Sequence, residues 1–124
     1  FGSKKIVNRF EEEGVRIDTV IGIGGVARKS PFIMQTLANV LNKPIKVALS
    51  DQAPALGAAI YAAVAAGIYP NVIEASQKMG SPFESEYAPQ LDKVAAYNKL
   101  LCAYDQLSAY ADPSIKKRKN ELYI

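Results

Sequence analysis

The sequence has no histidine and a single cysteine, Cys102. Without histidine, this chain has no imidazole base, no Ser-His or Cys-His catalytic pair and no histidine-ligated zinc. With one cysteine, it forms neither an internal disulfide nor a cysteine-based metal cluster. These absences exclude many enzyme mechanisms before any motif is considered. Cys102 itself lies in a patterned helical segment, where we expect it to be inert.

Long hydrophobic runs are also scarce. The longest, residues 53–69, is rich in alanine and contains Pro54 and Gly57, so no membrane span is expected. The first five residues lack the apolar segment of a secretory signal, which favours a cytoplasmic protein. The chain opens at Phe1, without an initiator methionine and just before a helix-like segment. We interpret it as an excised piece of a longer protein.

Positively and negatively charged residues are nearly balanced in this sequence. There are 15 Lys and Arg residues against 12 Asp and Glu, a net charge of +3, and residues 116–119 are all cations. Without that run the balance is slightly negative, whereas a nucleic-acid-binding surface spreads cations over a face. No nucleic-acid partner is therefore expected. We divide the chain into a domain at residues 1–112 and a basic tail at 113–124, which is either solvated or a weak anion contact.

Hydrophobic periodicity predicts an α/β domain. A length of 124 residues is enough for one core. Helices are expected at about residues 4–13, 31–41, 53–67, 72–79 and 90–110, and strands at 17–25 and 45–49. The first strand should be buried on both faces, as in a parallel sheet. Residues 81–89 are expected to be irregular and extended. Because two strands do not form an independent sheet, we expect further strands upstream of Phe1.

The turn between the first predicted strand and the helix that starts at Ser30-Pro31 is the most informative segment. Glycines such as Gly24 and Gly25 allow the backbone to approach a ligand closely. The helix that follows presents free N–H groups, and ligands of open α/β sheets bind beyond the carboxyl ends of the strands. The spacing matches neither the P-loop nor the complete dinucleotide fingerprint. A nucleotide site and a purely structural turn explain these residues about equally well.

Other candidate residues have both a functional and a structural interpretation. For Arg28 and Lys29 the functional interpretation is a phosphate contact, and the structural one is a pair of solvated cations. For Asp51 the functional interpretation is a contact with a ligand or metal, and the structural one is a cap of the alanine-rich helix. Gly57 costs that helix about 1 kcal/mol relative to alanine, which suggests a close neighbour or ligand. We expect the tyrosines of the last helix to lie in the core rather than to form a stacking platform.

Two segments resemble one known family. Residues 24–35 with 38–45 resemble the adenosine motif of the FGGY carbohydrate kinases, and residues 55–60 resemble the second connecting helix of that family. The spacing between the segments also fits. Within the family the similarity is greatest to the bacterial L-ribulokinase group, because Val26 stands where xylulokinases have a third glycine.

The resemblance implies the C-terminal part of an actin-like, ribonuclease-H-like ATPase domain, with few strands plus packed helices. The full protein would transfer the γ-phosphoryl group of Mg-ATP to a ketopentose, L-ribulose, in arabinose catabolism. Alternatives are a xylulokinase or other FGGY sugar kinase, a non-catalytic actin-like sugar-binding protein, and an unrelated binding domain. Discriminating features would lie upstream, where a phosphate-binding hairpin and a catalytic aspartate are expected.

The resemblance also implies which residues contact ATP or ADP. They are Gly24, Gly25, Val26, Ala27, Lys29 and Ser30, with Ser30 nearest the adenine. The catalytic base, the sugar-binding residues and the Mg²⁺ ligands are expected upstream, in the remainder of the same kinase chain. No catalytic or metal-binding residue is therefore assigned here, and this piece alone should be inactive. Whether the protein forms a homodimer is left open.

Overall fold

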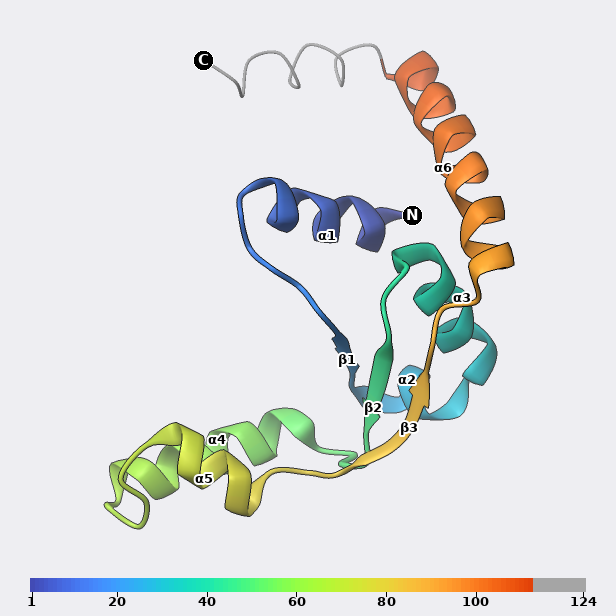
Figure 1. Cartoon of the computed structure of the whole chain (residues 1–124). Helices are drawn as coiled ribbons and strands as arrows, with labels where there is room; N and C mark the ends of the chain where they lie inside the picture. The colour runs from blue at the N-terminus through green and yellow to red at the C-terminus, as the bar shows by residue number, and fades with distance from the viewer. Residues whose placement is uncertain (113–124) are drawn as a thin grey trace.

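The computed structural model describes residues 1–112, so the predicted basic tail lies outside the described residues. The elements in chain order are α1 (Gly2–Glu12), β1 (Val20–Gly22), α2 (Gly24–Lys29), α3 (Pro31–Leu41), β2 (Ile45–Ala48), α4 (Ala53–Ala65), α5 (Val72–Met79), β3 (Phe83–Tyr87) and α6 (Leu91–Ala111) (Figure 1). Mixed helices and strands agree with the predicted α/β class. None of the helices in the described range is long and apolar enough to cross a membrane.

The three strands form one sheet in the order β1-β2-β3. β1 runs parallel to β2, with Val20 opposite Ile45, and β3 runs antiparallel to β2, with Tyr87 opposite Ile45. Residues 81–89 were predicted to be irregular and extended; over β3 the extended conformation is confirmed, but the segment is a regular paired strand rather than irregular. Its sequence contains two glutamates among five residues, so it lacks the usual apolar signal, and pairing with β2 defines it.

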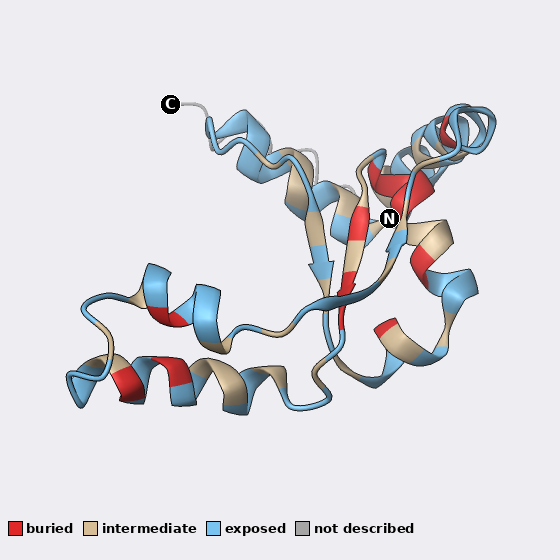
Figure 2. Ribbon diagram, turned by 60° about the horizontal axis from the view of Figure 1, so that its bottom comes forward, coloured by how far each residue is buried: buried red, intermediate tan, exposed pale blue. Residues whose placement is uncertain are grey.

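The first strand is shorter and more exposed than predicted. β1 covers three residues instead of nine, and 55% of Ile21 is exposed. In the described chain β1 pairs with β2 alone, so it is an edge strand, and the Ile21 side chain is largely open to solvent. β2 is the central strand and holds the fully buried Ile45 and Val47. Much of the central strand is drawn in red, the colour of buried residues, in Figure 2. The burial expected of the first strand is therefore found on one face of β2, where Ile45 and Val47 lie, and not on β1.

The core lies between the sheet and the two helices α2 and α3. It is a cluster of apolar side chains: Ala27, Met34, Ala38, Leu41, Ile45 and Val47. α3 starts as predicted, with Pro31 in its first turn and the Ser30 hydroxyl accepting a hydrogen bond from the Ile33 N–H at 3.4 Å. It ends at Asn42, whose φ of 55° is left-handed.

The remaining long helices lie away from this core. α4 and α5 pack against each other as a hairpin that extends from the sheet, and α6 passes along α3 toward α1 (Figure 1). Buried Asn39 fixes the start of α6, since its side-chain oxygen accepts a hydrogen bond from the Gln90 N–H at 2.8 Å. Further along α6, Asp105 pairs with Lys5 of α1 at 2.6 Å.

The tyrosines of α6 are not core residues in this chain, contrary to prediction. Tyr104 is 42% exposed and Tyr110 is 85% exposed, and Val94 is the buried residue of the helix. The periodicity of α6 is therefore real, but its apolar stripe has little to pack against within the described residues. Cys102 is a free, exposed thiol on the same helix.

Candidate nucleotide-binding site

Three segments of the chain converge at one edge of the sheet. β1 and β2 are parallel, so both end at this edge, and antiparallel β3 begins there. The end of β1 leads into α2, and the end of β2 leads through residues 49–52 into α4. This is the carboxyl edge, where open α/β sheets bind their ligands. The predicted turn is therefore in the position that the hypothesis requires.

The turn itself is a short helix, α2, which the sequence did not indicate. Gly24 opens it with a φ of 82°, a conformation that favours glycine. Ala27 anchors it, because this side chain is 4% exposed and belongs to the core. Gly22, at the end of β1, lies directly against Ala27. A Cβ added to Gly22 would come within 3.2 Å of the Ala27 Cβ and 3.4 Å of the Met34 Sδ.

Gly22 is thus a packing residue that the sequence reasoning missed. Its position inside the strand was visible, but only the fold shows which helix approaches it. By contrast, a Cβ added to Gly24 or Gly25 would meet no atom within 4 Å. These two glycines border open space, so a ligand can approach their backbone.

The other predicted site residues divide into exposed and enclosed groups. Val26 is 60% exposed and Lys29 is exposed, and no ion pair of Lys29 occurs within residues 1–112. Ala27 lies in the core, so its side chain does not face a ligand. Ser30 is half-buried and its hydroxyl caps α3. That Ser30 lies near the adenine stays a prediction.

Arg28 binds two carboxylates instead of standing free for phosphate. Its Nε donates to the Glu84 Oε2 at 2.7 Å and its Nη2 to the Oε1 at 3.4 Å, while Nη1 donates to Asp51. The hydrogen bonds to Glu84 and then Asp51 raise the pKa of Arg28, and the bond from Arg28 lowers the pKa of Glu84. In this structure Arg28 is therefore paired with carboxylates rather than free in solvent, and its contact with phosphate stays a prediction.

Asp51 does not cap the alanine-rich helix. The N-cap of α4 is Gln52, which makes no side-chain cap bond, and the Asp51 carboxylate pairs with Arg28. The predicted close neighbour of Gly57 is also absent from the described chain, because a Cβ there would meet no atom within 4 Å. The ligand or partner alternative for Gly57 stays a prediction.

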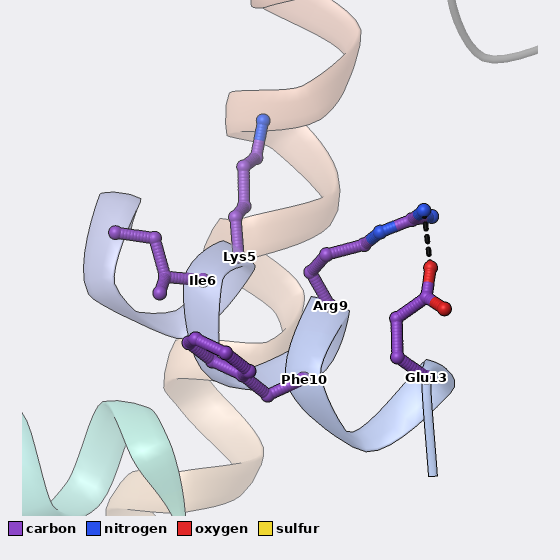
Figure 3. A pocket seen from close by; sticks show the side chains of 5 residues that line it. All are labelled: Lys5, Ile6, Arg9, Phe10 and Glu13. Atoms are coloured by element: carbon purple, nitrogen blue, oxygen red, sulfur yellow. Dashed lines mark ion pairs between the residues drawn. The ribbon is translucent and has the colours of Figure 1, made fainter. Parts of the chain in front are cut away.

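An apolar hollow lies elsewhere, on α1. It is lined by Lys5, Ile6, Arg9, Phe10 and Glu13, and Figure 3 shows all of these on or just after one helix. Arg9 is paired with Glu13, and Lys5 points toward α6. With no second element enclosing it, the hollow brings no groups together for chemistry. It is also separate from the carboxyl edge of the sheet.

A metal site was not predicted in this chain. Among residues 1–112, no group of three or more acidic or cysteine side chains could hold a metal ion. Asp51 and Glu84 do lie together, but Arg28 occupies the position between them. That the Mg²⁺ ligands lie upstream stays a prediction.

Comparison with known proteins identifies the class to which this fold and site belong. Residues 1–66 match the model of the FGGY family of carbohydrate kinases, C-terminal domain. The chain is 42% identical over 114 residues to a ribulokinase of Geobacillus thermodenitrificans, covering 89% of this chain and 20% of that protein. It is 42% identical over 116 residues to a ribulokinase of Vibrio parahaemolyticus, covering 88% and 20%.

Solved structures give the same class. A ligand-bound xylulose kinase from Lactobacillus acidophilus aligns with a TM-score of 0.67 and 29% identity, over 76% of this chain and 18% of that chain. A gluconate kinase from the same organism aligns with a TM-score of 0.69 and 27% identity, over 80% and 20%.

The class is thus that of the carbohydrate kinases, with the actin-like fold that the family resemblance implied. The chain belongs to the FGGY family, and its match lies in the C-terminal domain of that family. It spans about a fifth of the length of the curated relatives that it matches.

Proposed function

We propose that this chain is the nucleotide-binding C-terminal part of an ATP-dependent sugar kinase that phosphorylates L-ribulose. The observation that supports this most strongly is its identity of about 42% to proteins named ribulokinase, over nearly nine tenths of the chain. L-Ribulose is the ketose isomer of L-arabinose, so we place the enzyme in arabinose catabolism. We also propose a cytoplasmic location. A homodimer stays open.

The role of this chain is to bind and orient ATP. The backbone at Gly24 and Gly25 borders open space, which suits close approach by the nucleotide. Lys29 is exposed beside it and supplies a positive charge for phosphate. Phosphoryl transfer depends chiefly on positioning and charge neutralisation. The Mg²⁺ that accompanies ATP and the carboxylate that accepts the sugar hydroxyl proton are assigned to upstream residues.

A sugar panel tests the substrate. The full-length enzyme is assayed with Mg-ATP and L-ribulose, D-xylulose or gluconate in an ADP-coupled assay. We expect the highest kcat/KM for L-ribulose. A preference for D-xylulose would favour the alternative suggested by the xylulose kinase structure, and no turnover on any sugar would contradict the kinase assignment.

Substitution of Gly25 tests the nucleotide site. In the full-length enzyme, Gly25→Val should raise the KM for ATP about tenfold or more, because the new side chain would fill the space that the backbone leaves for the ligand. The KM for the sugar should stay within twofold. Since no atom lies within 4 Å of the new Cβ, the variant should fold. Unchanged ATP kinetics would contradict the site.

A further inference from the structure

The short helix α2 has few contacts of its own to hold it in place. It has six residues, one of them buried, and its N-cap makes no side-chain hydrogen bond. Its apolar attachment is the Ala27 methyl group above Gly22. Such a helix can tilt or fray unless a polar contact fixes its other side. Any displacement would move Gly24 and Gly25 relative to a bound nucleotide.

Arg28 provides that polar contact and joins three elements. It comes from α2, Glu84 is in β3, and Asp51 lies in the connection from β2 to α4. Two nitrogens of the guanidinium reach the two oxygens of Glu84, and a third reaches Asp51. Arginine fixes geometry in this way because its donors are planar and rigid. The side chain of Arg28 is 24% exposed, so it is more enclosed than an ordinary surface cation.

The charge of the cluster argues against direct phosphate binding by Arg28. One guanidinium faces two carboxylates, so the group as a whole is negative. An incoming phosphate would find three of the five N–H donors of Arg28 already engaged and would approach two nearby anions. Lys29, the neighbouring residue, has no such carboxylate partner in the described part of the chain.

We propose that Arg28 is a positioning residue that sets the affinity for ATP by fixing α2 to Glu84 and Asp51, without touching the nucleotide. The inference rests on the proposed function. It predicts that Glu84, which is remote in sequence from the glycine turn, affects ATP binding as Arg28 does. A direct phosphate contact by Arg28 predicts the opposite for Glu84, because removing the carboxylate would free the cation.

The experiment compares Arg28→Gln, Glu84→Gln and the double variant in the full-length enzyme. Each single variant should raise the KM for ATP about 3- to 10-fold, with kcat and the KM for sugar within twofold. The double variant should resemble the single variants, since both remove the same bond. Arg16→Gln is the matched control: Arg16 also pairs with an aspartate, but its side chain is 85% exposed and away from the site, so its kinetics should equal wild type.

Two further variants keep the test informative if Arg28→Gln fails to fold. Arg28→Lys retains the charge without the planar donors and should still raise the KM for ATP. Asp51→Asn alters a carboxylate that is 75% exposed, and should raise the KM about twofold. General destabilisation would lower active enzyme and apparent kcat instead of changing KM.

Several results would overturn the inference. If Glu84→Gln leaves the KM for ATP unchanged or lowers it, Arg28 does not act through Glu84. If Arg28→Gln and Glu84→Gln add fully, they act separately. These outcomes separate failure of this inference from failure of the proposed function. If only the inference fails, Gly25→Val still raises the KM for ATP. If the proposed function fails, neither Gly25→Val nor the Arg28 and Glu84 variants change the KM for ATP.

Discussion

Two regions of this chain bury their apolar residues to very different extents. The first, which we call the sheet body, comprises β1, β2, β3, α2 and α3 and contains the core cluster around Ile45 and Val47. The second, which we call the outlying helices, comprises α4, α5 and α6. Their exposed large apolar residues, counting Ile68 in the connection between α4 and α5, are Tyr61, Ile68, Ile73, Leu91, Leu100, Tyr104, Leu107 and Tyr110. The sheet body also exposes apolar side chains, including Ile21 and Phe32, but it encloses a contiguous buried cluster. The outlying helices enclose no such cluster in the described chain and bury only Ile60, Ala63, Ala75 and Val94.

This difference indicates which part of the chain depends on a partner. Apolar surfaces of this extent usually mark an interface. The chain spans about a fifth of its curated relatives, so we propose that the remainder of the kinase covers the outlying helices. The turn that we propose binds the nucleotide lies on the sheet body, so this chain would form one wall of the site and the remainder of the kinase the others.

The largest expected effect concerns nucleotide binding by the two forms of the protein. The isolated chain should bind ADP with a dissociation constant near millimolar, on the order of −4 kcal/mol, because it supplies one wall of the cleft. Full-length enzyme should bind far more tightly, and the isolated chain should not phosphorylate L-ribulose. Calorimetric titration of both forms with ADP measures this. Micromolar binding by the isolated chain would show that it contains a complete site.

Glycine substitutions compare the packing of the two regions. Gly22→Val in the sheet body should destabilise both forms of the protein by about 1–3 kcal/mol, because its side chain would press on Ala27 and Met34. Gly57→Leu in α4 should leave the isolated chain unchanged or stabilise it by up to about 1 kcal/mol, because no atom lies nearby.

In the full-length enzyme the same Gly57→Leu substitution should instead destabilise by about 1–3 kcal/mol, since the covering layer leaves little room. Denaturant unfolding of both forms gives these values. Equal effects of Gly57→Leu in the two forms would contradict the proposed cover on α4.

The smallest effect is a pH dependence within the sheet body. Arg28 lowers the pKa of Glu84, so the stability that Glu84 contributes is complete above the pKa of an unfolded glutamate. It is lost as the pH falls through the lower folded value. Glu84→Gln should therefore reduce the denaturation midpoint more at pH 7 than at pH 3. An equal reduction at both pH values would exclude ionisation of Glu84 as the cause.

Local signals in the sequence were sufficient for much of the helical structure. Ser30 and Pro31 fix the start of α3 because a cap and a preset φ act within one turn. Asn71 and Gly80 enclose α5, whose observed bounds match the prediction. The adenosine-motif resemblance likewise depends on a continuous segment, and it gave the correct family.

Features that depend on distant residues were missed. β3 has no strong apolar pattern, and its backbone pairing with β2 is what makes it a strand. Arg28 pairs with Asp51, which is 23 positions further along the chain, and with Glu84, which is 56 positions further along. The exposure of Tyr110 could not be predicted either, because periodicity shows which face of a helix is apolar and not what covers it.

Photolabelling tests the central claim, that the glycine turn of this chain contacts the nucleotide. The full-length enzyme is irradiated with 8-azido-ATP, with and without excess ATP, and the labelled peptides are identified by mass spectrometry. We expect an ATP-protected label within residues 24–34, beside the adenine. ATP-protected label confined to peptides outside that segment would contradict it.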